Sequence, residues 1–588
     1  MDKAKIGLRC GALASAAVLA LTACGSSGGG GGSGSGSGAS GGNNKGGTLT
    51  ILTQAEQMAH IDPQRDYVGE DMAFTSGYLV RTLTAYQLSK DGTKSGQLVG
   101  DLATDTGKAS DGGKTWTFTL RDGVKWQDGT GVTCADVKYG VSRTFAQSVI
   151  TDGPTYAIQL LDIPKAADGT STYKGPYETA KNDTAAYDKA VGCSSDNKTI
   201  TFHLNRPAGD FNYTVTLTAF AAVPKSKDTG EKYDDKIFSD GPYMVTENTK
   251  GQQLVLDRNP NWSAATDSYR PALPDKIVMK FSLQTSVIDQ RMEADAGADK
   301  SAISRDALDT PSLTTVFNDQ RFASRRINEY DPYVYYLAIN TTKVPNLKHR
   351  QAIMAAMDRA QILTIYGGSY AGDVADGVVK PNLKADYAPT GLWDTLLGAK
   401  VPDSGDPELA KKLIAESGAP MPTITYDYGQ GPAEDKEAAS IQASLAKAGI
   451  TVKINPIPRG QRNSVEMNPA TEGSLEWTAW APDWLNASTV IPEMFTPSGG
   501  WPLSRANDKA FNDKAAAAKA ELDRAKQGTM WQELSKEAMA NAWAVPLRFS
   551  RTQRLAGSKV GAVSGINGQV YLWAPYGSWS YADLYVKK

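Results

Sequence analysis

The residue types that most often carry out catalysis are few and scattered in this chain. Its three histidines, His60, His203 and His349, lie far apart and lack the short spacing of a metal-binding motif. Gly113-Lys114-Thr115 has the ending of a phosphate-binding loop, but Lys108 stands where that loop needs its first glycine. No G-x-S-x-G turn follows a predicted strand, and no carboxylate pair stands out as an acid/base couple. The sequence therefore favours binding over catalysis and predicts neither a cofactor nor a metal site.

Cysteine chemistry is more informative, beginning at the N-terminus. Lys3, Lys5 and Arg9 precede an apolar stretch, residues 10–21, that is too short to cross a bilayer. The stretch leads into Leu-Thr-Ala-Cys24, which resembles the lipobox of bacterial lipoproteins. The sequence thus predicts a signal peptide over residues 1–23. It also predicts a lipid on Cys24 that anchors the chain at the extracytoplasmic face of the bacterial cell membrane.

Two further cysteines remain once the N-terminal segment is set aside. Residues 24–47 are nearly all glycine and serine after Cys24, and such a composition predicts a flexible linker. Cys134 and Cys193 follow it. In an exported protein these two can form a lasting disulfide, and two free buried thiols are the alternative.

Overall composition is that of an ordinary soluble globular protein. The chain has 588 residues, a formal net charge of −2 and 40% hydrophobic residues. Nucleic-acid binding needs a basic face, which this near-neutral balance does not supply. No apolar run reaches the roughly 20 residues of a membrane-spanning helix. Because the length exceeds what one hydrophobic core supports, we expect two or three domains.

Apolar periodicity predicts strands and turns between residues 93 and 205. Trp116, Phe118 and Leu120 alternate with threonines, a pattern typical of a strand with one buried face. Thr133 with Asp136 three positions later predicts a capping box at the start of a helix. This part of the chain therefore reads as a mixed α+β region.

The C-terminal half shows a different order of elements. A strand at 423–428, a helix at 434–447 and a strand at 452–454 follow one another with short links. Strand, helix and strand in this order form a βαβ unit, and such units build parallel sheets covered by helices. The sequence thus predicts an α/β lobe here.

Several strings are more specific than these patterns when they are taken together. They occur in the order Trp116–Thr130, Thr133–Tyr139, Ser239–Tyr243, Leu256–Trp262, Leu337–Asn340, Arg350–Arg359 and Trp480–Trp484. In content and order they resemble the family 5 extracellular solute-binding proteins, the oligopeptide- and dipeptide-binding components of ABC importers. The resemblance covers about residues 80 to 550.

The resemblance implies an α/β (mixed α+β) architecture of the two-lobed, type II periplasmic-binding-protein kind. Two lobes would close on the ligand like a hinged clamp, with an extra subdomain inserted in lobe one. The implied boundaries are 48–92, 206–280 and 545–588 for lobe one, 93–205 for the inserted subdomain and 281–544 for lobe two.

The resemblance also implies a ligand site. In peptide-binding relatives, the aspartate of a Trp-x-x-Asp-Tyr stretch holds the amine of the ligand. Carried over to this chain, that role falls to Asp483, with Trp480 and Trp484 as further ligand-binding residues. The alternative is that Asp483 caps local backbone and the tryptophans are core. This chain departs from the family pattern in two places: Trp484 stands where a tyrosine is usual, and Leu485-Asn486 stands where Pro-Asp is common. Both departures affect the shape of the loop and so the class of ligand that it would bind.

The resulting hypothesis is a monomeric, lipid-anchored solute-binding protein that hands a peptide to the permease subunits of an ABC importer. An oligosaccharide is an alternative ligand, because relatives bind cellobiose-like sugars and the C-terminal half is rich in tryptophan. A nickel chelate is a further alternative, which the scattered histidines do not support. From other classes, a surface enzyme and a sensory or adhesive lipoprotein remain open.

Overall fold

The computed structural model describes residues 44–180 and 182–588. The predicted signal peptide, the lipid site Cys24 and most of the predicted linker lie outside these residues. Among the helices that are described, none is both long enough and apolar enough to cross a membrane.

The first lobe is built on a mixed five-stranded sheet. β1 runs parallel to β10 and β11, whereas β9 is antiparallel to β10 and β8. Along the sheet the strands are β11 (Ala302–Ser304), β1 (Thr48–Leu52), β10 (Lys276–Lys280), β9 (Gln253–Arg258) and β8 (Tyr243–Thr249). Leu49 and Ile51 of β1 are fully buried, so this strand lies in the core. Helices of the same lobe are α1 (Gly69–Tyr78), α5 (Phe211–Thr214), α6 (Thr285–Ala294) and α7 (Thr310–Asn318).

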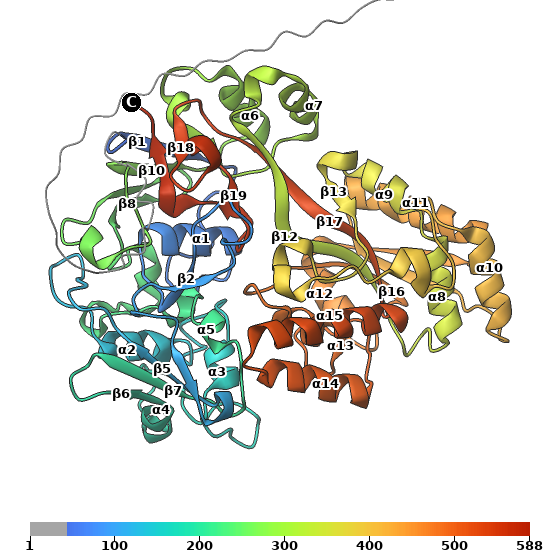
Figure 1. Ribbon diagram of the computed structural model, residues 1–588, viewed down its shortest axis with the longest axis horizontal. Coiled ribbons are helices and arrows are strands. Elements are labelled where there is room, and N and C mark those ends of the chain that lie inside the picture. Colours follow the sequence, from blue (N-terminus) through green and yellow to red (C-terminus); the bar gives the residue numbers. More distant parts are fainter. Residues whose placement is uncertain (1–43, 181) are drawn as a thin grey trace, which may run out of the picture. The chain divides into compact units, whose positions relative to one another are not determined.

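A separate antiparallel sheet lies within the segment predicted as the inserted subdomain (Figure 1). It contains β4 (Lys108–Ser110), β5 (Thr115–Thr119), β7 (Thr199–His203) and β6 (Val191–Cys193), accompanied by α2 (Cys134–Arg143), α3 (Tyr156–Leu160) and α4 (Thr184–Ala190). Trp116 and Phe118 are buried, as their alternation predicts. The capping box is present as well, since the Thr133 backbone N–H donates to Asp136 Oδ2 at 2.9 Å. In the structure a disulfide joins the first residue of α2, Cys134, to Cys193 of β6.

The second lobe is built on a six-stranded mixed sheet. Its strands, in spatial order, are β13 (Gly372–Val374), β17 (Ala544–Leu555), β12 (Arg326–Ile339), β16 (Leu475–Trp480), β14 (Ile424–Gly429) and β15 (Val452–Ile457). β14 and β15 are parallel, and α11 (Pro432–Lys447) connects them, so the predicted βαβ unit is present. The other helices of this lobe are α8 (Leu347–Ala356), α9 (Arg359–Ile365), α10 (Pro407–Glu416), α12 (Arg462–Glu466), α13 (Ile491–Phe495), α14 (Lys509–Ala520) and α15 (Arg524–Ala540).

Two long antiparallel strands, β12 and β17, join the lobes (Figure 1). Their register shifts between Tyr330 and Val334, where Asp331-Pro332 interrupts the pairing. On one side of this irregularity, from Val334 onward, β12 also pairs with β16 of the second lobe. On the other side, Leu555 packs into a cluster with Leu52 of β1 and Ile288 of α6. The chain therefore passes between the lobes within one pair of strands, a geometry suited to a hinge.

Strand pairing corrects the two predicted positions at which the chain passes from one lobe to the other. The expected start of lobe two at 281 is too early, because β11 at 302–304 pairs with β1 of the first sheet. The expected return at 545 is too early as well, because β17 stays hydrogen-bonded to β12 and β13 past that residue. Sequence could not place these points, since both depend on pairing between strands far apart in the chain. Three two-stranded sheets complete the first lobe: β2 (Thr84–Tyr86) with β3 (Leu98–Gly100), β18 (Val560–Ala562) with β21 (Leu584–Val586), and β19 (Leu572–Trp573) with β20 (Ser578–Trp579).

Candidate ligand-binding site

The loop that follows β16 presents the motif on which the sequence analysis focused. β16 ends at Trp480, and Asp483 lies three residues beyond it. Thr489 fixes the loop from the far side: its hydroxyl oxygen accepts from the Asp483 backbone N–H at 3.1 Å. Its carbonyl oxygen accepts from Trp480 Nε1 at 2.6 Å. These two bonds tie the start of the loop, at Trp480 and Asp483, to Thr489.

Asp483 meets two tyrosines of the first lobe. Tyr67, just before α1, donates its hydroxyl to Oδ1 at 2.8 Å. Tyr156, the first residue of α3, donates its hydroxyl to Oδ2. The carboxylate therefore lies between the lobes, and each of its oxygens accepts a hydrogen bond across the boundary.

Comparison with Asp228 shows what this carboxylate lacks. Asp228 also accepts two tyrosine hydroxyls, from Tyr139 at 2.8 Å and Tyr177 at 2.6 Å. Its charge is balanced by Arg143, whose Nε lies 3.2 Å away. Asp483 likewise accepts two tyrosine hydroxyls, from Tyr67 and Tyr156, but among the described residues it has no cation within ion-pair distance. This half-buried carboxylate lies between the lobes without such a partner, so the site is suited to a cation supplied by a ligand.

The pKa of Asp483 reflects this incomplete compensation. Burial raises the pKa to about 6, although the hydroxyls of Tyr156 and Tyr67 act to lower it. The negative charge of Glu493 also contributes to this rise. An ammonium group placed beside Asp483 would favour the ionised form and reverse this shift.

The two tryptophans of the motif occupy different environments. Trp480 is half-buried, with its indole N–H bonded inside its own lobe, so one part of the ring remains accessible. Trp484 is 5% exposed, and its Nε1 donates to Asp210 Oδ2 of the first lobe at 2.8 Å. Its ring meets that of Tyr156 edge to face, with centroids 4.7 Å apart. The structure thus gives Trp484 lobe-to-lobe contacts instead of the open face expected of a ligand wall.

Exposed aromatic and apolar side chains border Asp483. Tyr67 is 41%, Val68 45% and Tyr333 46% exposed. Tyr67 and Val68 come from the first lobe, and Tyr333 comes from β12. A small cavity of about 40 Å³ continues the space next to Tyr156 and Trp484. Such a border suits side chains of a bound molecule.

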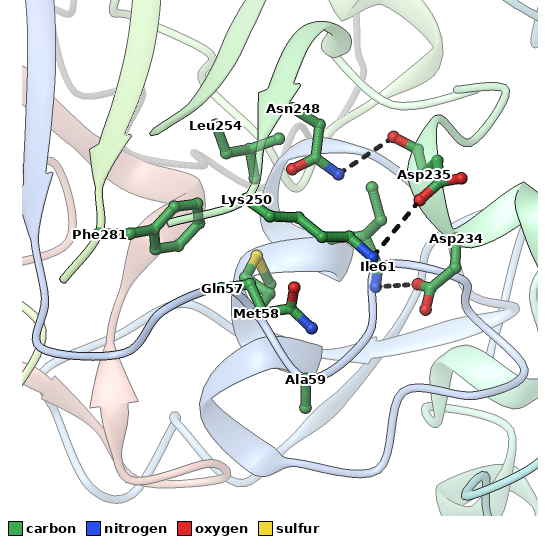
Figure 2. Close-up of a pocket in the computed structure, with 10 residues that line it drawn as sticks. All are labelled: Gln57, Met58, Ala59, Ile61, Asp234, Asp235, Asn248, Lys250, Leu254 and Phe281. Atoms are coloured by element: carbon green, nitrogen blue, oxygen red, sulfur yellow. Dashed lines mark hydrogen bonds and ion pairs between the residues drawn. The ribbon is translucent and has the colours of Figure 1, made fainter. Parts of the chain in front are cut away.

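Other hollows are less suited to a ligand held between lobes. The pocket in Figure 2 is small, about 30 Å³, which is room for one or two water molecules. Its own residues bridge it: the Ile61 N–H donates to Asp234 Oδ1 at 2.7 Å, and Asn248 donates to the Asp235 carbonyl at 3.1 Å. A wider hollow of about 790 Å³ lies wholly within residues 145–180, so closure of the lobes would not enclose it.

Metal binding has no support in the part of the chain that is described. Within residues 44–180 and 182–588, no group of three or more His, Cys, Asp or Glu side chains could hold a metal ion.

Tyr67 and Tyr156 are the site residues that sequence reasoning missed. They lie 416 and 327 positions from Asp483. Neither belongs to a recognisable motif, and nothing in the local sequence marks them. Co-variation of positions 67 and 156 with position 483 among related sequences could have found them, because residues in contact tend to change together.

Comparisons with known proteins agree with the fold described above. A family model for bacterial extracellular solute-binding proteins, family 5 (middle region), matches residues 97–502. The probable D,D-dipeptide-binding periplasmic protein DdpA of Escherichia coli K12 is 25% identical over 456 residues, which are 74% of this chain and 75% of that protein. The oligopeptide-binding protein OppA of Bacillus subtilis 168 is 27% identical over 373 residues, covering 59% and 61% of the two chains. A solved structure of clavulanic acid biosynthesis oligopeptide binding protein 2 has a TM-score of 0.81 at 28% identity, covering 93% of this chain and 96% of that one.

Proposed function

This chain belongs to family 5 of the bacterial extracellular solute-binding proteins, and we propose that it captures a peptide between its two lobes for an ABC importer. The observation that carries the proposal is the Asp483 carboxylate, which meets two tyrosine hydroxyls and has no protein cation within ion-pair distance among the described residues. The similar proteins named above are peptide-, dipeptide- or oligopeptide-binding by their own names, which favours a peptide over a sugar or a metal chelate.

Asp483 acts as the anchor for the ammonium of the ligand. A charge-assisted hydrogen bond between carboxylate and ammonium is among the strong kinds, and exclusion of water by the lobes strengthens it. Tyr67 and Tyr156 hold the carboxylate in place from the opposite lobe. Trp480 offers a partly exposed flat surface beside it, suited to ligand side chains of varied shape.

The site calls for a ligand with a free amine, which gives a direct test. We would measure binding by the full chain of a pool of tri- to pentapeptides, once with free N-termini and once N-acetylated. Acetylation removes the positive charge and leaves the remainder of each peptide unchanged. The expected result is a raised melting temperature with the free pool only, since a ligand at 100 times its Kd adds about 2.7 kcal/mol to stability.

Variants separate the anchor from general effects on the fold. Asp483→Asn should abolish the rise given by the free pool and keep the melting temperature without ligand. Asp435→Asn is the matched control, because the exposed Asp435 also accepts a tyrosine hydroxyl, from Tyr428 at 2.8 Å. Asp435→Asn should bind the pool as the wild type does. Equal binding of acetylated and free pools would overturn the anchor role, and a response to cello-oligosaccharides alone would overturn the peptide ligand.

The membrane anchor is a separate part of the proposal. Cys24 receives a lipid and becomes the first residue of the mature chain when the signal peptide is removed. The glycine- and serine-rich linker lets the monomeric binding protein reach its permease. Its support is the lipobox-like string that ends at Cys24. Metabolic labelling with a radioactive fatty acid should mark the wild type and leave Cys24→Ser unlabelled; labelling of both proteins would contradict it.

A further inference from the structure

The wide hollow in the inserted subdomain is separate from the site around Asp483. Its volume is about 790 Å³, within the range of about 300–1,000 Å³ that is usual for small-molecule sites. Its lining residues all belong to the segment 145–180, which includes α3 (Figure 1). None of them hydrogen-bonds to Asp483, so the proposed peptide function leaves this space unused.

Aromatic and aliphatic side chains form one wall of the hollow. Phe145 and Tyr173 are 4% and 5% exposed, and their rings meet edge to face with centroids 5.3 Å apart. Tyr173 also stacks on Tyr187, with centroids 4.4 Å apart. The half-buried Val149 and Ile158 line the hollow as well. Because these ring contacts hold the aromatic side chains in place, the apolar wall is formed before any ligand arrives.

Two lysines on one hairpin add positive charge to the lining. Lys165 forms an antiparallel bridge with Ser171. Lys174 Nζ donates to the hydroxyl oxygen of Thr170, the neighbour of Ser171, at 2.6 Å. Neither lysine has a carboxylate within ion-pair distance among the described residues. The hairpin therefore brings two cationic residues of the lining close together, and both ammonium groups lack an anionic partner.

Acidic side chains near the lysines are bound to their own turns. Glu178 is the only acid among the described residues that line the hollow, and its Oε1 accepts the N–H groups of Thr179 at 2.8 Å and Ala180 at 2.7 Å. Asp168 Oδ1 accepts the N–H of Thr170 at 2.9 Å and its hydroxyl at 2.6 Å. The lining thus has two cations and one carboxylate, which gives it a net positive charge.

We propose that this hollow is a second ligand site, which binds a small organic carboxylate with an aromatic or aliphatic body. The body lies against the wall that contains Phe145, Val149 and Tyr173, and burial of its apolar surface supplies most of the affinity. The carboxylate pairs with Lys165 and Lys174, which selects acids over neutral molecules of the same shape. This site works independently of the proposed peptide site.

The test uses the full chain and a rigid aromatic acid, para-benzoylbenzoate. Its Kd is measured by calorimetry at low ionic strength, beside that of para-benzoylbenzamide, which has nearly the same shape without the charge. The acid should bind about three- to tenfold more tightly than the amide, the range expected of two exposed ion pairs. Equal affinity of the two probes, or failure of both to bind, would overturn the proposal.

Variants assign the preference for the acid to the two lysines. In the double variant Lys165→Gln, Lys174→Gln, the acid should bind only as well as the amide. The amide should keep its wild-type Kd, which also shows that the variant is folded. The matched control is Lys108→Gln, Lys189→Gln, because these exposed lysines of the same subdomain do not line the hollow; it should keep the preference. Val149→Gln should weaken both probes, since it makes the apolar wall polar.

Photolysis locates the bound probe. Under near-ultraviolet light a benzophenone inserts into C–H bonds that it contacts, so mass spectrometry of a digest identifies the labelled segment. The label should appear within residues 145–180 and should decrease in the double lysine variant. Label confined to other segments would overturn the proposal, as would a preference for the acid that survives in the double variant. Either result would leave the peptide function untouched, because the two sites use different residues.

Discussion

Trp484 of the second lobe donates its indole N–H to Asp210 Oδ2 of the first lobe at 2.8 Å. Both side chains are nearly buried, at 5% and 4% exposure. Ser488, from the same loop as Trp484, donates its hydroxyl to the same carboxylate oxygen. Separation of the lobes would break both bonds, so Asp210 stabilises the arrangement in which the loop bearing Asp483 contacts the first lobe.

Trp484→Phe should therefore weaken ligand binding without removing the anchor. The variant keeps an aromatic ring beside Tyr156 but removes the donor to Asp210, which costs about 1.5–3 kcal/mol for a bond to a charged group. We expect the Kd for peptides to rise about tenfold or more, measured by calorimetry. Trp501→Phe is the control, because Trp501 Nε1 donates to Thr478 within the second lobe at 2.9 Å. Equal losses in the two variants would contradict a special role of the bond to Asp210.

Peptide binding should weaken in acid because of Asp483. The pKa of this carboxyl is raised to about 6 by burial, and only its ionised form pairs with an ammonium. We expect the Kd to be nearly constant from pH 7 to 8, and to rise by up to about tenfold per pH unit below pH 6. Calorimetric titrations between pH 4.5 and 8 measure this profile. In Asp483→Asn the residual binding should lose this acid dependence; a profile unchanged by the substitution would assign it to another group.

Glu476 should make the second lobe less stable as pH rises. Burial, together with the neighbouring charges of Asp427, Glu466 and Glu472, raises the pKa of this carboxyl to about 9. Oε1 accepts from the Gly473 N–H at 2.5 Å, while Oε2 is buried without a partner among the described residues. Because the folded pKa lies above the ordinary value of 4.5, the folded state binds the extra proton. The free energy of unfolding should therefore fall as pH rises from about 4.5 to 9.

Glu476→Gln tests this assignment, since it removes the charge at nearly constant shape. At pH 8 the variant should raise the free energy of unfolding by at least about 1 kcal/mol in urea titrations, and it should flatten the pH dependence. Glu408→Gln is the control, because the exposed Glu408 makes only a surface pair with Lys411. That variant should stay within about 0.5 kcal/mol of the wild type. A less stable Glu476→Gln at pH 8 would show that the side chain is ionised and well compensated.

Removal of the disulfide should destabilise the first lobe. Cys134 and Cys193 are 59 positions apart, so their bond closes a long loop in the unfolded chain. The double variant Cys134→Ser, Cys193→Ser should lose about 2–4 kcal/mol of unfolding free energy. A reducing agent should lower the melting temperature of the wild type toward that of the variant and leave the variant unchanged. A wild type insensitive to reduction under unfolding conditions would mean that the thiols are not paired.

Sequence alone determined much of the local structure. The capping box of Thr133 and Asp136 and the alternation of Trp116 with Phe118 involve residues within a few positions of each other. Such features depend on backbone geometry and the side-chain period, which a short window of sequence contains. The βαβ unit that includes β14 and β15 was predictable for the same reason. The motif around Asp483 was visible because its residues are contiguous in the chain.

Tertiary structure alone decided what surrounds that motif. Tyr67 and Tyr156 reach Asp483 from hundreds of positions away. The role of Trp484 depended on the fold in the same way, since only the docking of the lobes brings Asp210 to its indole. Contacts of this kind follow from long-range packing, and a local pattern contains no information about which distant residue will lie opposite. The site is therefore a product of the fold, even though one of its residues could be named from the sequence.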